Sequence, residues 1–170
     1  MFSKLRRARA DLGTMNRLLP RAEQIAHSAA AERPGAEHLL LAALEFDDTQ
    51  AQDVLGELGV TAHELQAAIA QQHTDALASI GITADDAAID AALPAPRSAP
   101  KVYLAEGSLQ DTFQRAVELA KRDKSTLRSG HILLATCDTE HGTLARALQQ
   151  LGVDRHQLQS VTRRRLDQED

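Results

Sequence analysis

Aromatic residues are scarce in this chain, which has 170 residues but no Trp, one Tyr and three Phe. Hydrophobic residues still make up 43% of the sequence, so a core must be built from Leu, Ala, Ile and Val. Strands are enriched in β-branched and aromatic residues, whereas this composition suits closely packed helices. We therefore expect an all-α protein, built as one domain or as two small halves that share a core.

Cysteine is nearly absent as well. Cys137 is the only one, which excludes an intramolecular disulfide and fits a reducing cytoplasm. Its apolar surroundings in the sequence predict a buried, inert thiol. The chain also lacks an apolar run of the ~18 residues that a membrane-spanning helix needs, and its first residues lack the apolar core of a secretion signal. We expect a cytoplasmic protein that does not enter a membrane.

No charge of one sign dominates the sequence. It has 19 Lys and Arg residues, 24 Asp and Glu residues and a formal net charge of −5, whereas a basic patch or stripe is the usual footprint of nucleic-acid binding. The 170 residues contain no Gly-Lys pair, which excludes a phosphate-binding P-loop. We expect the protein to bind no nucleic acid and to have neither ATPase nor any other enzymatic activity. The alternative is a hydrolase centred on Cys137, with His141 and Asp138 nearby in the sequence.

What the chain does contain is a repeat. The stretch G-A-E-H-L-L-L-A-A-L begins at Gly35, and G-H-I-L-L-A begins about ninety residues later at Gly130. The alignment that places His38 on His131 also pairs apolar residues and glycines farther along the chain without a gap. Upstream, a shift of one residue extends the match to the preceding helix. The chain is therefore a tandem duplication. The downstream pairs include Leu55 with Leu148, Gly59 with Gly152, and Val60 with Val153.

Apolar spacing and the placement of Pro and Gly divide the chain into four parts. We expect an N-terminal arm or short helix over residues 1–14 and a first repeat with an extra helical segment over 15–93. A Pro-rich linker is predicted over 94–107 and a second repeat over 108–170. These parts are expected to form one compact domain.

Individual residues predict where helices begin and end. The stretch Ala36 to Phe46 is apolar on most of its surface and should be the most buried helix of the first half. Thr49 and Thr61 each begin a T-x-x-[EQ] pattern, which predicts a capping box at a helix start. Gly59 and Gly152 are predicted to end helices, because glycine tolerates the left-handed conformation found there.

With the repeats laid out, the chain resembles the Clp N-terminal domain, the double Clp repeat that precedes the ATPase modules of ClpA, ClpB and ClpC type unfoldases. The resemblance rests on the G-A-E-H-L-L-L-A-A-L stretch at Gly35, on S-G-H-I-L-L-A at Ser129, and on L-x-x-L-G-V at Leu55 and Leu148. It implies a pseudo-twofold tandem repeat of two four-helix units, about eight helices in all. Because no P-loop is present, we expect a free-standing domain without an ATPase module.

The resemblance also implies a ligand site. In ClpC-type relatives, a glutamate before each repeat histidine helps to bind phosphoarginine tags. Glu37 keeps this position, but Gly130 replaces its mate, and Ala36 and Ser129 replace the family threonines, so at most the first site is expected to be competent. The alternative is that Glu37 only stabilises a helix N-terminus. The candidate ligand-binding residues are Glu37, His38, Ser129, His131 and Phe2, the last as a substitute for an aromatic residue of the family's adaptor and cyclic-peptide surface.

The two repeat histidines suggest a metal, but they lie in separate repeats, and the sequence nearby offers no further ligands at zinc spacing. We predict that His38 and His131 cap or pack their helices, and that the chain binds neither a metal nor a cofactor.

The family resemblance implies a non-enzymatic protein that engages protein clients, adaptors or peptide inhibitors of the Clp protease system. It would act as an accessory factor, a competitor or a decoy for a full-length unfoldase. The expected partners are a Clp unfoldase, adaptor or client proteins, phosphoarginine-tagged proteins and cyclic peptides. The alternative is a structural or regulatory helical protein that has kept the fold and lost the ligand site, because a fold alone does not establish a function.

Overall fold

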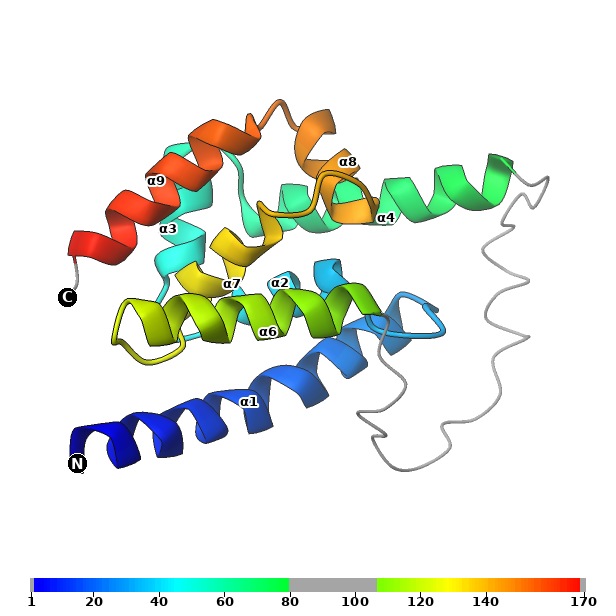
Figure 1. Cartoon of the computed structure of the whole chain (residues 1–170). Coiled ribbons are helices and arrows are strands. Elements are labelled where there is room, and N and C mark those ends of the chain that lie inside the picture. The colour runs from blue at the N-terminus through cyan, green and yellow to red at the C-terminus, as the bar shows by residue number, and fades with distance from the viewer. Residues whose placement is uncertain (1, 80–106, 169–170) are drawn as a thin grey trace.

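The computed structural model in Figure 1 describes residues 2–79 and 107–168. All regular structure in these ranges is helical, which confirms the predicted all-α fold. The extra helical segment after Ser79 and the Pro-rich linker, except Gly107, lie outside the described residues. Eight helices are described: α1 (Phe2–Ser28), α2 (Ala36–Ala43), α3 (Gln50–Glu57), α4 (Ala62–Ser79), α6 (Gly107–Arg122), α7 (Ser129–Thr136), α8 (Thr143–Gln150) and α9 (Arg155–Gln168).

The duplication is visible in the backbone hydrogen bonds that end corresponding helices. After α1 the chain turns through Ala30 (φ 54°), and after α6 it turns through Lys124 (φ 56°), so both helices end on a left-handed residue. In each case the next amide donates to a carbonyl five residues earlier, the closing bond of a Schellman motif. These bonds are Ala31 N to Ala26 O at 2.9 Å and Ser125 N to Ala120 O at 3.0 Å.

The third helix of each repeat ends in the same matched way. Gly59 has φ 75° and Gly152 has φ 73°, which confirms that glycine supplies the left-handed conformation at both positions. The closing bonds are Val60 N to Leu55 O and Val153 N to Leu148 O, both at 2.9 Å. Both repeats therefore share one backbone plan.

The central helices α2 and α7 are the most buried elements, since every residue of each is buried. α1 covers α2, and α6 covers α7, whereas α4 packs on α8 and α3 packs on α9. The last helix of each repeat thus packs against the third helix of the other, which joins the two repeats in one core. The fully buried leucine and isoleucine side chains of this core are Leu18, Leu39, Leu40, Leu55, Leu65, Ile132, Leu133 and Leu158.

The N-terminal segment differs from the prediction of a separate arm or short helix over residues 1–14. α1 runs without interruption from Phe2 and includes Pro20. Contacts with the second repeat hold its first half: Arg7 donates to the carbonyl of Lys124, and the amide of Leu127 donates to Asp11 Oδ1 at 2.8 Å. Long-range hydrogen bonds that no local pattern reveals therefore extend this helix.

One predicted capping box forms and the other does not. Glu64 N donates to Thr61 Oγ1 at 3.2 Å, and Thr61 N donates to Glu64 Oε2 at 2.8 Å, as predicted. Thr49 instead adopts a left-handed conformation and makes no cap hydrogen bond with its side chain. The carboxylate of Asp48 takes this role by accepting from Gln50 N at 3.2 Å.

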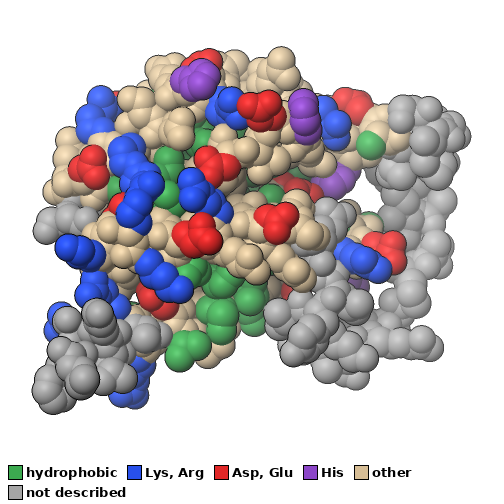
Figure 2. Space-filling view, viewed as in Figure 1, with side chains coloured by type: hydrophobic (Ala, Val, Ile, Leu, Met, Phe, Trp, Pro, Cys, Tyr) green, Lys and Arg blue, Asp and Glu red, His purple; other side chains and the backbone are tan. Residues whose placement is uncertain are grey.

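Figure 2 shows acidic and basic side chains interspersed over one face, with Lys and Arg most frequent toward the end where α9 terminates. Three consecutive arginines near that end are paired with carboxylates, which limits the positive potential they create. No helix among the described residues is both long and apolar enough to cross a membrane. The arginine pairs are Arg163 with Asp123, Arg164 with Glu57 and Arg165 with Asp53.

Candidate functional site

The two repeat histidines cap the helices that carry them. Gly35 N donates to Nδ1 of His38 at 3.0 Å, and Arg128 N donates to Nδ1 of His131 at 3.2 Å. Both rings are buried. An Nδ1 that accepts a hydrogen bond leaves the proton of a neutral imidazole on Nε2, so each ring presents a donor at its far edge.

In the second repeat, that far edge meets a polar cluster. Nε2 of His131 lies 3.2 Å from Ser125 Oγ and 3.8 Å from Asp123 Oδ2. Arg163 completes the cluster by donating to Asp123 Oδ2 at 2.8 Å. The His131 ring is thus enclosed by side chains of its own repeat.

Glu37 lies in the first turn of α2 and is buried, with 8% of its surface exposed. Its carboxylate folds back over Gly35, where an added Cβ would lie only 2.7 Å from Oε2. Any other residue at position 35 would therefore displace the carboxylate. Oε1 lies 3.4 Å from Nδ1 of His38 and 3.8 Å from Nε2 of His73, a residue of α4.

The corresponding start of α7 is filled by side chains of the first repeat. Ser129 N donates to Asp48 Oδ2 at 2.9 Å, and Ser129 Oγ donates to Asp48 Oδ1 and accepts from Ala51 N. At Gly130 an added Cβ would lie 2.8 Å from Gln50 Oε1. Ser129 is buried and engaged within the molecule, as is His131 on the same turn of α7. The side chain of Phe2 lies outside the described residues.

The first site is more open. A cavity of about 180 Å³ separates the start of α2 from the start of α8. In the register of the repeats, His141 occupies the place of Asp48, so this cavity has an imidazole where the start of α7 has a carboxylate. Hydroxyl groups, His141 and Arg146 lie opposite Glu37. The polar lining residues are Glu37, Ser108, Thr136, Thr139, His141, Thr143 and Arg146.

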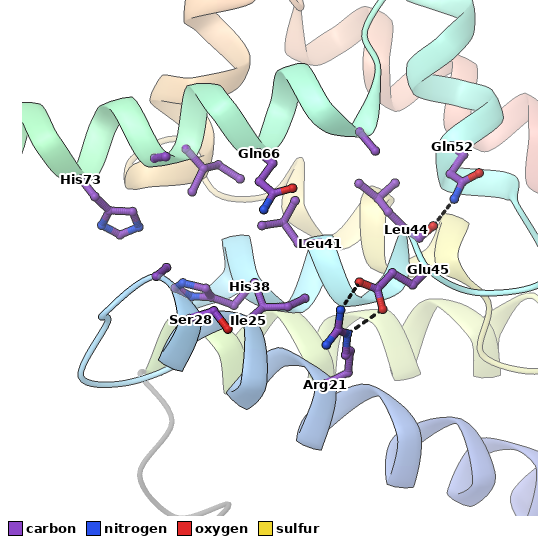
Figure 3. A pocket seen from close by; sticks show the side chains of 14 residues that line it. Arg21, Ile25, Ser28, His38, Leu41, Leu44, Glu45, Gln52, Gln66 and His73 are labelled. Atoms are coloured by element: carbon purple, nitrogen blue, oxygen red, sulfur yellow. Dashed lines mark hydrogen bonds and ion pairs between the residues drawn. The ribbon is translucent and has the colours of Figure 1, made fainter. Parts of the chain in front are cut away.

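A larger pocket of about 560 Å³ lies between α1, α2 and α4 (Figure 3). At one end Arg21 donates to both carboxylate oxygens of Glu45, at 2.6 and 2.7 Å. At the other end His73 projects from α4 toward His38 of α2, with the ring centroids 6.0 Å apart. Sequence reasoning missed His73, because it belongs to no motif.

Glu37, His38 and His73 offer ligand atoms that lie within 4.8 Å of one another, so their distances permit a metal ion. The proton on His38 argues against one. A metal at Nε2 would have to displace the proton that the cap leaves there, and a metal at Nδ1 would break the bond from Gly35 N. Glu37 and His73 alone provide fewer than the three protein ligands of the usual zinc site. We assign no metal to this cluster.

Cys137 lacks the features of a catalytic nucleophile. Burial raises the pKa of its thiol to about 12, and the carboxylate of Asp138 acts in the same direction. The thiolate is the reactive form, so the group is inert near neutral pH. Sγ donates to the carbonyl of Leu133 at 3.5 Å. These features disfavour the hydrolase alternative.

Comparison with known proteins identifies the repeats. The model of the Clp repeat (R) N-terminal domain matches residues 13–93 and 106–170, which together form most of the chain. No curated protein sequence gives a significant match.

Solved structures agree on the fold. The N-terminal domain of the caseinolytic protease associated chaperone ClpD from Arabidopsis thaliana is similar, with a TM-score of 0.56 and 17% identity over 89% of this chain and 90% of that one. A structure from work on a malarial protein secretion system has a TM-score of 0.58 and 18% identity over 91% and 92%. At this level of identity, the likeness establishes the fold alone.

Proposed function

The chain belongs to the family of the Clp repeat (R) N-terminal domain, and from this premise we propose that it is a non-enzymatic binding module of the Clp protease system. Domains of this fold generally bind substrates or adaptors. In this proposal the module engages clients, adaptors or peptide inhibitors. Because the 170 residues contain no P-loop, they bind a client without unfolding it and act as an accessory factor, competitor or decoy.

The difference between the starts of α2 and α7 carries the proposal. Ser129 is held by Asp48 within the molecule, whereas Glu37 borders a cavity. A filled site at α7 and an open one at α2 support the view that only one of the two family ligand sites is competent, the one in the first repeat.

We propose phosphoarginine as one ligand of this site. The carboxylate of Glu37 would pair with the guanidinium, and such a charge-assisted pair is stronger than a neutral hydrogen bond. Arg146, His141 and the hydroxyl of Thr143 lie across the cavity, where they can donate to the phosphate. Phosphoarginine has a cationic guanidinium and an anionic phosphate. The site offers an acidic group for the first and hydrogen-bond donors for the second.

Retention on beads tests the proposal. Beads that carry a protein phosphorylated on arginine should retain the chain, and beads that carry the same protein without phosphate should not. Glu37→Gln keeps the side-chain size but removes the charge, so it should abolish retention. Glu118→Gln, at an exposed acidic position of α6, is the matched control and should bind normally. Equal retention with and without phosphate, or by Glu37→Gln, would contradict the proposal.

The alternative is a structural or regulatory helical protein that has kept the fold and lost the ligand site. The internal bonds of Ser129 favour it, because one of the two family sites is already filled. This alternative predicts that neither kind of bead retains the chain.

A further inference from the structure

The polar cluster around His131 has no counterpart around His38. The matched backbone hydrogen bonds that end α1 and α6 show which residues of the two repeats correspond after these helices. The alignment of α4 with α9 in the repeat register gives the corresponding residues of the last helices. All three polar residues of the second cluster are replaced by alanine in the first repeat. Asp123 corresponds to Ala29, Ser125 to Ala31, and Arg163 to Ala70.

The frame around these positions is otherwise retained. The Arg21–Glu45 pair at the end of the large pocket corresponds to the Arg115–Asp138 pair of the second repeat, with shortest N–O distances of 2.6 and 2.5 Å. A general rearrangement of the helices would not preserve this pair. The replacements by alanine therefore act locally, on the space between the helices.

The large pocket occupies that space. Ala29 and Ala70 both line it, and α4 packs less extensively on α2 than α9 packs on α7. The smaller side chains of Ala29 and Ala70 thus border a pocket beside His38 where the second repeat has a filled cluster. Its volume of about 560 Å³ falls within the range of about 300–1,000 Å³ that is typical of small-molecule sites.

The charges near the pocket favour an uncharged ligand. The replacements remove one acid and one base together, and the remaining Arg21–Glu45 pair is already complete. The carboxylate of an anionic ligand beside His38 would lie near the carboxylate of Glu37. The first repeat has no counterpart of Arg163 that could neutralise its charge. Burying a charge without a partner is costly, so the pocket selects against anions.

The polar groups at the end of the pocket formed by His38 and His73 suit an amide. The cap orients His38 as it orients His131, so its Nε2 edge faces the place where the second repeat has the hydroxyl oxygen of Ser125. Nε2 of His73 is buried and has no hydrogen-bond partner within the described part of the chain. An amide offers both an acceptor and a donor to these two rings. The apolar walls are formed by Ile25, Leu41, Leu44 and Ile69.

We propose that this pocket binds an uncharged apolar group, of the size of a leucine or phenylalanine residue, that carries an amide. The amide meets His38 and His73, and the apolar part fills the space beside Ala29 and Ala70. This ligand differs in chemistry from phosphoarginine, and its site adjoins the site at Glu37, whose Oε1 lies 3.8 Å from Nε2 of His73. A free small molecule and a residue within a peptide share this chemistry.

Nuclear magnetic resonance of the ¹⁵N-labelled chain with N-acetyl-L-phenylalaninamide as the probe tests the proposal. Saturable shifts are expected at the amides of Leu41, Ala70 and His73. The anionic analogue, N-acetyl-L-phenylalanine, should bind at least about tenfold more weakly, a difference of about 1.4 kcal/mol. A blocked tripeptide with a central phenylalanine distinguishes a peptide ligand from a free small molecule. If it binds more tightly than N-acetyl-L-phenylalaninamide, the ligand is a residue within a peptide, and if it binds more weakly, the ligand is a small molecule.

The second repeat supplies the matched variant. Ala29→Asp, Ala31→Ser and Ala70→Arg together rebuild the cluster that the fold already accommodates around His131, and should abolish the shifts while the chain stays folded. If this triple variant does not fold, Ala70→Leu fills the pocket with an apolar side chain and should also block binding. The absence of saturable shifts in the unaltered chain, or unchanged binding by a folded pocket-filling variant, would overturn the proposal.

Discussion

Replacing Asp48 with alanine should destabilise the fold much more than the same change at its neighbour Asp47. The carboxylate of Asp48 accepts from Ser129 N, from Ser129 Oγ and from Gln50 N. Asp48→Ala removes all three hydrogen bonds, so α3 loses the bond that caps it and Ser129 at the start of α7 loses two acceptors. Asp47 has 93% of its side chain exposed and pairs with Arg17 at 3.6 Å.

The size of the effect follows from these contacts. Hydrogen bonds to a charged group contribute about 1.5–3 kcal/mol each, but bonds that share one carboxylate do not add, and loss of a cap alone costs about 0.5–2 kcal/mol. We therefore expect Asp48→Ala to lower the free energy of unfolding by about 3 kcal/mol. An exposed ion pair contributes about 0–1 kcal/mol, which sets the limit for Asp47→Ala.

Urea unfolding followed by circular dichroism at the helix band measures both variants. With an m-value of about 2 kcal/mol per molar, the midpoint of Asp48→Ala should fall by about 1.5 M. In a thermal scan, Tm should fall by about 6–12 °C for a chain of this size. Asp47→Ala should remain close to the unaltered protein in both assays. A loss below about 1 kcal/mol for Asp48→Ala, or equal losses in the two variants, would refute the role given to Asp48.

Three further predictions follow from the core and the caps. Leu40→Ala should cost about 2–5 kcal/mol in urea unfolding, whereas Leu12→Ala, at a residue 56% exposed, should change little. Native Cys137 should resist iodoacetamide at pH 8 and react after denaturation, because burial raises its pKa to about 12; rapid native labelling would show the thiol to be accessible. Hydrogen bonds from Thr61 lower the pKa of Glu64 below its usual 4.5. Above pH 4.5, the unaltered protein should therefore be more stable in urea unfolding than Glu64→Gln. This difference should disappear as the pH falls through the lowered pKa of Glu64.

The sequence predicted those parts of the fold that depend on local pattern. The apolar surface of the central helices predicted that they are buried, and Gly59 and Gly152 predicted the left-handed ends of two helices, because only local backbone geometry is involved. The extent of α1 was not predictable in this way. Its first half is held by Asp11 and Leu127, which are far apart in the sequence.

Capping shows the same limit at a single residue. Thr61 forms its box with a residue three positions away, so pattern alone identified it. Thr49 carries the same pattern, but Asp48 caps the helix and also reaches Ser129 in the other repeat. A contact between repeats thus decided which of two neighbouring residues caps α3.

The site was predictable to a similar extent. The repeat motif placed Glu37 and His38 at a helix start, and the structure places them there. His73 was missed because its position near His38 depends on how α4 packs. A comparison of the repeats could have indicated this region, since three polar residues around His131 are all alanine in the first repeat.

The central claim is that one of the two family ligand sites remains competent, at Glu37. Calorimetric titration of phosphoarginine into the purified chain, with free arginine as the control, tests it most directly. We predict saturable binding of a single equivalent, no heat with arginine, and loss of binding in Glu37→Gln. Binding of two equivalents, binding that persists in Glu37→Gln, or no binding by the unaltered chain would contradict it.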